Sequence, residues 1–171
     1  MKVQTNPWKH IIVDDFFNEA DFKHFCDIGK DLHDRIKSHQ KIIKTLDSSY
    51  QDKYHSKAIE YLKVLEPRKL PCVDRFQLDI QAVGIEEESQ NFVHVDRKDK
   101  LLSIVVYGYP SNHVGTYIGT REDLKPLEWK QNRALIFSRS KDTWHKFSTD
   151  GIGPRVTFNI NLYTNYFEDN S

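Results

Sequence analysis

The chain has 171 residues, which is enough for one compact domain with its own core and too few for two ordinary domains. Lysine and arginine total 25, aspartate and glutamate also total 25, and the formal net charge is therefore zero. This balance argues against a nucleic-acid-binding protein, because such a protein needs an excess of basic residues on one face.

Cysteine content and hydropathy indicate the compartment. Cys26 and Cys72 have neither the spacing of a metal site nor that of a disulfide framework, which fits a reducing environment. Residues 1–17 contain no apolar run of signal-peptide length, and no segment approaches the roughly 20 apolar residues of a membrane span. We therefore expect a cytoplasmic protein that does not enter membranes, whose oligomeric state the sequence leaves open.

The chain begins with a predicted strand and a predicted helix. A compact apolar run over 8–13 predicts the strand. Asn18 then predicts a helix start, because its side-chain oxygen can accept a hydrogen bond from an otherwise unpaired backbone amide. The apolar residues that follow recur at helical spacing, and they are Phe22, Phe25, Cys26, Gly29, Leu32 and Ile36.

A second helix is predicted before residue 67. Its apolar face would carry Tyr54, Ala58, Tyr61, Leu62 and Leu65, and Pro67 would end it. The lysine-rich stretch over 30–69 also contains many acidic residues, so we interpret it as solvated helix faces.

From Cys72 onward the pattern takes the two-residue period of a strand. Apolar residues at 76, 78, 80 and 82 alternate with polar ones. Further strands are predicted over 92–95, 101–109, 116–118, 134–137, 144–147 and 155–163. Many short strands separated by glycine, proline, asparagine and aspartate predict a sandwich or barrel.

The last predicted strand has one apolar and one polar face. The apolar face, which can pack on a core, carries Val156, Phe158, Ile160 and Leu162. The polar face carries Arg155, Thr157, Asn159, Asn161 and Tyr163. Because buried polar groups need partners, we expect this second face to line a cavity.

His94 and Asp96 form a candidate metal motif, since a strand places residues i and i+2 on the same face. The motif is common by chance when it stands alone. With His145 on a later strand, however, it gives two imidazoles and one carboxylate, a ligand set that suits Fe(II) with open coordination positions. Arg155 follows His145 by ten residues (155 − 145 = 10) and would supply the charge that holds an acidic co-substrate.

In this order the motifs resemble the Fe(II)- and 2-oxoglutarate-dependent oxygenases, most closely their prolyl-4-hydroxylase-like branch. The matching segments lie at 81–84, 94–96, 101–107, 115–116, 134–137, 144–145 and 155–157. The resemblance implies a mainly β fold in a single domain over 1–171. A double-stranded β-helix of the jelly-roll or cupin-like type would occupy 71–165, and N-terminal α-helices over 1–70 would support it.

The resemblance also implies a role for each site residue. His94, Asp96 and His145 would bind Fe(II), and Arg155 would pair with the distal carboxylate of 2-oxoglutarate. Thr157 and Tyr107 would add hydroxyl groups to that carboxylate. The implied reaction uses O2 to hydroxylate a C–H bond of a peptidyl substrate, prolyl included, or of a small molecule, and it releases succinate and CO2.

Two other interpretations of the sequence remain open. A cupin-like protein would share the barrel but bind another metal or a small ligand, as an isomerase or a sensor. Cupins typically place two histidines close together on one strand, whereas this chain has Asp96 at the second position. The chain could also be a non-catalytic β-sandwich binding module. In that case His94, Asp96, His145 and Arg155 would occur in this order by chance.

The acidic run Glu86-Glu87-Glu88 precedes the metal motif. A solvated loop is the simpler interpretation of such a run. If it overhangs the metal instead, it would favour a cationic substrate.

Overall fold

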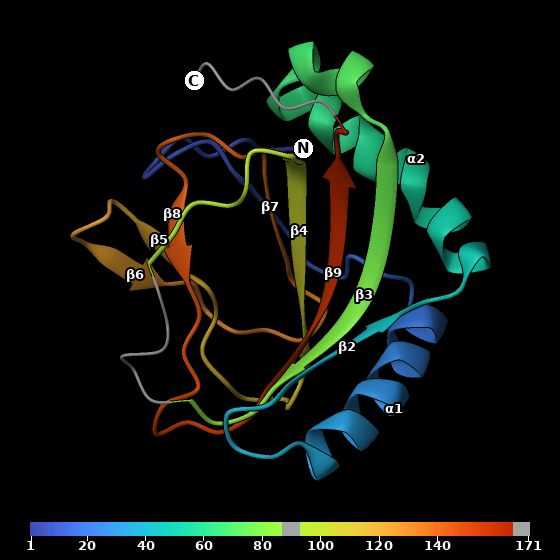
Figure 1. Ribbon diagram of the computed structural model, residues 1–171, viewed down its shortest axis with the longest axis vertical. Coiled ribbons are helices and arrows are strands. Elements are labelled where there is room, and N and C mark those ends of the chain that lie inside the picture. The colour runs from blue at the N-terminus through green and yellow to red at the C-terminus, as the bar shows by residue number, and fades with distance from the viewer. Residues whose placement is uncertain (87–92, 166–171) are drawn as a thin grey trace.

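The computed structural model describes residues 1–86 and 93–165, which form two antiparallel sheets and two long helices (Figure 1). The six-stranded sheet has, in order, β1 (Ile11–Val13), β7 (Ala134–Phe137), β4 (Lys100–Tyr109), β9 (Arg155–Tyr163), β3 (Arg75–Val83) and β2 (Lys41–Thr45). The three-stranded sheet has, in order, β6 (Leu124–Pro126), β5 (Tyr117–Gly119) and β8 (Trp144–Lys146).

Both helices lie on the side of the large sheet that faces away from the small one (Figure 1). They are α1 (Glu19–Arg35) and α2 (Ser48–Leu65), and a 3-10 helix, η1 (Pro67–Cys72), follows the second. Asn18 caps α1 as predicted, because its Oδ1 accepts a 2.8 Å hydrogen bond from the backbone nitrogen of Asp21. The second helix ends before Pro67, which also agrees with the sequence.

The main core lies between the helices and the large sheet. The apolar face of β9 is fully buried there, and its members Val156, Phe158, Ile160 and Leu162 are all 0 % exposed. They pack in one cluster with Phe25 of α1 and Leu62 of α2. Burying one such side chain contributes about 1.5–3 kcal/mol, so this layer fixes the position of β9 and turns its polar face toward the small sheet.

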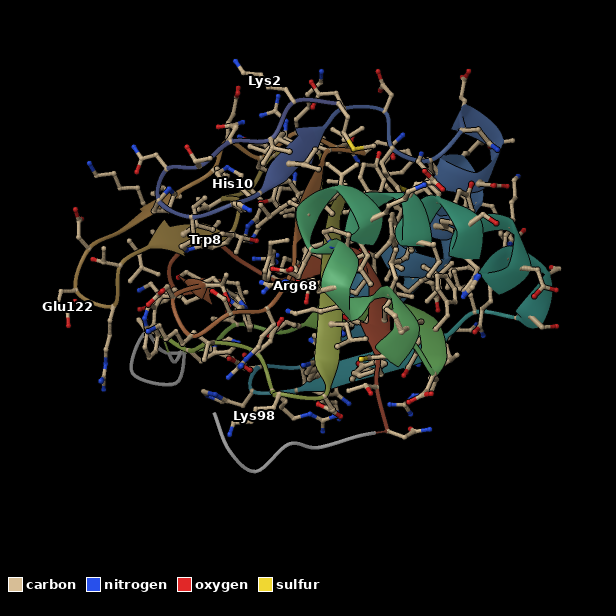
Figure 2. The ribbon with its side chains drawn as sticks, turned by 90° about the horizontal axis from the view of Figure 1, so that it is seen from above. Lys2, Trp8, His10, Arg68, Lys98 and Glu122 are labelled. Atoms are coloured by element: carbon tan, nitrogen blue, oxygen red, sulfur yellow. The ribbon has the colours of Figure 1, made fainter. Side chains whose placement is uncertain are left out.

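The N-terminal segment links the two sheets on the side away from the helices. Trp8 and His10 lie beside the small sheet in the view from above, where Glu122 marks the tip of the β5–β6 hairpin (Figure 2). Trp8 Nε1 donates a 3.2 Å hydrogen bond to the carbonyl of Gly119 in β5, and its ring lies 5.1 Å from that of Phe137 in β7. This second, smaller apolar cluster also contains Ile118 and Leu135.

Two strands of the structure were not predicted from the sequence. The lysine-rich stretch that we interpreted as helix faces contains β2, which pairs with β3 at the edge of the large sheet. The hairpin strand β6 was not predicted either. Both are short edge strands exposed over much of their length, so neither has the apolar pattern of a core strand. Within the described ranges, no helix is both long and apolar enough to cross a bilayer.

Candidate metal centre and its cavity

Three potential metal ligands meet beside a cavity between the two sheets. One ligand atom from each of His94, Asp96 and His145 lies within 4.8 Å of the other two. Oδ1 of Asp96 is 3.4 Å from Nε2 of His145 and 3.7 Å from Nε2 of His94. Two imidazoles and one carboxylate in this arrangement can bind a divalent ion and leave other coordination positions open.

Backbone pairing brings the two histidines together. The backbone nitrogen of His94 donates to the carbonyl of His145 over 3.1 Å, and the reverse bond measures 3.0 Å. The predicted strand over 92–95 is wrong, because His94 forms an isolated bridge with His145. Val93 and Val95 lie outside regular structure, and Phe92 falls outside the described residues. His94 and Asp96 nevertheless both line the cavity, as the prediction required.

A second hydrogen bond orients the ring of His145. Its Nδ1 lies 2.8 Å from the carbonyl oxygen of Thr143. A carbonyl can only accept, so Nδ1 carries the proton and donates it. The lone pair of a neutral ring then lies on Nε2, the atom nearest to Asp96, where a metal ligand needs it.

Asp96 is held as a charged carboxylate. Burial alone raises the pKa of this group, but its contacts with His145 and His94 and the charge of Lys100 outweigh burial and bring the pKa far below its usual range. The oxygen that is not directed at the histidines, Oδ2, accepts a 2.6 Å hydrogen bond from Ser103 and lies 3.5 Å from Lys100 Nζ. The two carboxylate oxygens therefore have different surroundings.

The cavity has a volume of about 210 Å³. The polar face of β9 forms one wall with Arg155, Thr157, Asn159 and Asn161, as the sequence predicted, while Tyr163 is not part of the lining. Phe137 and Phe147 add apolar surface. The cavity thus combines convergent polar groups with apolar walls, which is typical of small-ligand sites.

Arg155 contributes a buried positive charge to this cavity, as the sequence predicted, and no ion pair joins it to a carboxylate among the described residues. The residue is 4 % exposed, and its Nη1 has no hydrogen-bond partner among the described residues. Aromatic rings surround its guanidinium carbon: the centroids of Phe147, Trp129 and Tyr107 lie at 5.2, 5.6 and 6.0 Å. Burial lowers the pKa of Arg155 to about 10. A buried charge of this kind normally has a partner, so an anionic ligand fits the site.

Thr157 and Tyr107 have different positions relative to this cavity. Thr157 lines it, and its hydroxyl oxygen accepts a 2.9 Å hydrogen bond from Nδ2 of Asn159, which leaves the hydroxyl proton available to a ligand. Tyr107 is not among the lining residues. Its hydroxyl accepts a 2.8 Å bond from the backbone nitrogen of Thr116, and its ring stacks on Trp129 at 4.7 Å.

Several cavity residues were not identified from the sequence. Ser103, Lys100, Thr116 and Lys41 all line the cavity, and Ser103 and Lys100 contact Asp96 directly. One signal could have identified Ser103, since it is the single polar residue in the predicted apolar strand segment 101–106. Of the acidic run at 86–88, only Glu86 lies within the described residues.

No family model and no curated protein sequence matches the chain. Solved structures do match it. A viral collagen prolyl hydroxylase from Paramecium bursaria Chlorella virus-1 is similar with a TM-score of 0.62 and 16% identity, over 97% of this chain and 95% of that one. A prolyl-4-hydroxylase from Pseudomonas putida is similar with a TM-score of 0.59 and 8% identity, over 91% of this chain and 92% of that one.

A third similar structure is a prolyl hydroxylase from Trichoplax adhaerens, solved in complex with a peptide fragment of the oxygen degradation domain of hypoxia inducible factor. Its TM-score is 0.62 at 10% identity, over 91% of this chain and 83% of that one. Likeness at such low identity is evidence of the fold alone. The chain therefore has the double-stranded β-helix fold of the prolyl hydroxylases, which confirms the fold class predicted from the sequence.

Proposed function

We propose that this protein is an Fe(II)- and 2-oxoglutarate-dependent dioxygenase. It would hydroxylate a C–H bond of a peptidyl or small-molecule substrate and release succinate and CO2. One observation carries the proposal: the ligand set of His94, Asp96 and His145 shares a cavity with the buried guanidinium of Arg155, whose Nη1 has no hydrogen-bond partner among the described residues. A metal site alone would fit many proteins, but a metal site with a buried anion receptor fits an acidic co-substrate.

The donor set suits Fe(II). Its three side chains supply two neutral nitrogens and one charged oxygen, and they leave room for further ligands. When bound, Fe(II) would supply the activation of dioxygen and the redox chemistry of the reaction. The contribution of the chain is to hold the ion, to orient both substrates and to keep water away from the reacting atoms.

Two further groups of the cavity fit the distal carboxylate of 2-oxoglutarate. Arg155 offers a planar, charged fork for the distal carboxylate, and the hydroxyl of Thr157 lies on the same strand face. The viral collagen prolyl hydroxylase was also solved as a complex with 2-oxoglutarate, with a TM-score of 0.57 to this chain. A peptidyl substrate is supported by the Trichoplax hydroxylase, whose structure contains a peptide.

Anaerobic titration tests the proposal. Addition of Fe(II) and then 2-oxoglutarate to the purified protein should produce the visible metal-to-ligand charge-transfer band of a chelated 2-oxo acid. Admission of air should then release succinate, and Asp96→Ala should show neither signal. Bound iron without the band would favour a cupin-like protein, and absence of iron binding would favour a binding module; either result would overturn the proposal.

A further inference from the structure

The charge of the cavity lining is strongly unbalanced, although the whole chain is formally neutral. Among the described residues that line it, the only carboxylate is Asp96, whereas Arg155, Lys41, Lys100 and Lys146 are cationic. If the proposed function holds, two negative charges of 2-oxoglutarate and the one of Asp96 balance the ion and Arg155. Lys41 and Lys100 then add positive charge to the cavity.

Lys100 is the lysine nearest to the metal ligands. Its Nζ lies 3.5 Å from Asp96 Oδ2, which already accepts a shorter bond from Ser103. A bound divalent ion would repel this ammonium and draw on the charge of the same carboxylate, which weakens the ion pair. Lys100 would therefore have donor capacity and charge available for a second anion.

Lys41 lies on the cavity side of β2, the edge strand of the large sheet. Its ladder partner is Val83, which also lines the cavity, and its neighbour on the same face, Ile43, pairs with Gln81 of the lining. Within the described parts of the chain, the side chain of Lys41 makes no hydrogen bond or ion pair. Ile43 is 52 % exposed, so it offers apolar surface on the same strand face as Lys41.

The edge of β2 suits an extended chain more than a compact metabolite. The strand ends the order of the six-stranded sheet, so its outer backbone groups have no strand partner among the described residues. An extended peptide can pair with such an edge and place alternate side chains on the face that carries Lys41 and Ile43. Its negative charges would then face Lys41 and Lys100.

From these observations we infer that the primary substrate is an acidic peptide that lies along β2 and places a glutamate or aspartate side chain against Lys41 and Lys100. The inference rests on the proposed function and names its substrate class. The inferred substrate has the opposite charge to the cationic substrate that the acidic run at 86–88 suggested. The binding experiment described next therefore decides between the two.

Matched peptide libraries test this inference by binding. Three fluorescent dodecapeptide libraries would share a randomised centre and differ only in the flanking residue, which is Glu, Gln or Lys. Anisotropy would be measured with the protein loaded with Mn(II) and 2-oxoglutarate. The Glu library should bind most tightly, and because exposed charges are screened within about 10 Å at 0.1 M salt, its advantage should shrink as salt rises.

Variants connect the preference to the two lysines. Lys41→Gln and Lys100→Gln should each reduce the ratio of Glu-library to Gln-library affinity by about two- to five-fold, the range for an exposed ion pair. Lys44→Gln is the matched control, because Lys44 lies on the same exposed strand but on its opposite face, and this variant should keep the ratio. Thermal melting would check that each variant is folded.

Any of the following outcomes would overturn the inference of an acidic peptide substrate. Equal or tighter binding of the Gln or Lys library would exclude an acidic substrate. An unchanged ratio with a raised Kd for 2-oxoglutarate would assign the lysines to the co-substrate. If no library binds although the charge-transfer band forms with Fe(II), the substrate is not an acidic peptide and the proposed function still stands. If the band itself is absent, the proposed function fails as well.

Discussion

Ser103 holds one of the two carboxylate oxygens of Asp96. Its hydroxyl donates a 2.6 Å hydrogen bond to Oδ2, while Oδ1 remains directed at the two histidines. Ser103 is 3 % exposed and is fixed in the central strand β4, so water cannot easily replace it. The bond therefore fixes the rotation of the carboxylate and leaves Oδ1 as the oxygen available to an ion.

Removal of this hydroxyl should weaken metal binding. We expect Ser103→Ala to raise the Kd for Fe(II) or Mn(II) by about 10–100-fold, which is the usual effect of losing a hydrogen bond to a metal ligand. Calorimetric titration of the metal-free protein measures this directly. Ser56→Ala, at an exposed position of α2, is the control and should bind metal like the wild type. An unchanged Kd for Ser103→Ala would show that Asp96 is oriented by other contacts.

Arg155 should destabilise the protein while its anion is absent. Its buried Nη1 lacks a partner among the described residues, and an unsatisfied buried donor costs about 1–3 kcal/mol or more when it is charged. Arg155→Met keeps much of the side-chain length without the charge. We expect it to raise the free energy of unfolding in urea when no 2-oxoglutarate is present. A lower free energy of unfolding would contradict this account.

The same variant should lose its response to the co-substrate. Hydrogen bonds to charged groups contribute about 1.5–3 kcal/mol, so Arg155→Met should raise the Kd for 2-oxoglutarate by at least about ten-fold. Thermal melting with increasing 2-oxoglutarate would show a rising Tm for the wild type and a flat one for the variant. Arg121→Met, in the exposed turn before β6, is a suitable control.

The site was largely predictable because its ligands lie in or beside regular strands. His145 and Arg155 belong to β8 and β9, and the two-residue period of β9 predicted the four of its residues that line the cavity, although it also included Tyr163, which does not. His94 was predicted in a strand, but it forms an isolated bridge with His145 instead. This pairing joins distant parts of the chain, so a local sequence pattern could not predict it.

The residues missed by the prediction owe their roles to tertiary contacts. The sequence of β2 is Lys-Ile-Ile-Lys-Thr, and its charged residues lie within a helical region, so only the pairing with β3 makes it a strand. Lys100 and Ser103 are near Asp96 in sequence, but their contact with its carboxylate requires the turn that precedes β4. Such a turn cannot be inferred from periodicity.

The two thiols should differ strongly in reactivity. Burial raises the pKa of Cys26 to about 12, and its Sγ lies 3.9 Å from the carbonyl of Gly108, where α1 packs on the large sheet. Cys72 is exposed at the end of η1. With Ellman's reagent at pH 8 we expect one fast thiol per chain, because the thiolate is the reactive form. Cys72→Ser should remove the fast phase; two equally fast thiols would mean that α1 does not protect Cys26.

Acid stability should depend partly on Asp14, which precedes α1. Its hydrogen bond with Arg133, together with Lys130, lowers its pKa to about 2 from the ordinary 3.8. The folded state therefore binds the proton more weakly than the unfolded state, and the stabilisation is present above about pH 4 and is lost as the pH falls toward 2. Asp14 is 38% exposed, which limits the effect to below about 1 kcal/mol.

Urea unfolding at two pH values checks this point. Asp14→Asn should be less stable than the wild type at pH 6, and the two proteins should converge near pH 2. A difference that persists unchanged at pH 2 would mean that the ion pairs with Arg133 and Lys130 are not its origin.

Tyr107 provides a last test of the assignments around the co-substrate. Its hydroxyl accepts the backbone hydrogen bond of Thr116, its ring stacks on Trp129, and its ring centroid lies 6.0 Å from the guanidinium carbon of Arg155. Tyr107→Phe keeps the ring but leaves the buried amide of Thr116 without an acceptor. We expect a loss of about 1–3 kcal/mol in the free energy of unfolding, the cost of an unsatisfied buried donor, and an unchanged Kd for 2-oxoglutarate.

The opposite pattern would follow if the phenol contacts the co-substrate as the sequence resemblance implies. In that case the Kd for 2-oxoglutarate would rise in Tyr107→Phe while the urea midpoint stays near that of the wild type. Tyr50→Phe is the matched control, since Tyr50 lies on α2 away from the cavity and should change neither quantity. Measuring both quantities on the same preparations distinguishes a hydroxyl that supports the wall near Arg155 from one that binds the ligand.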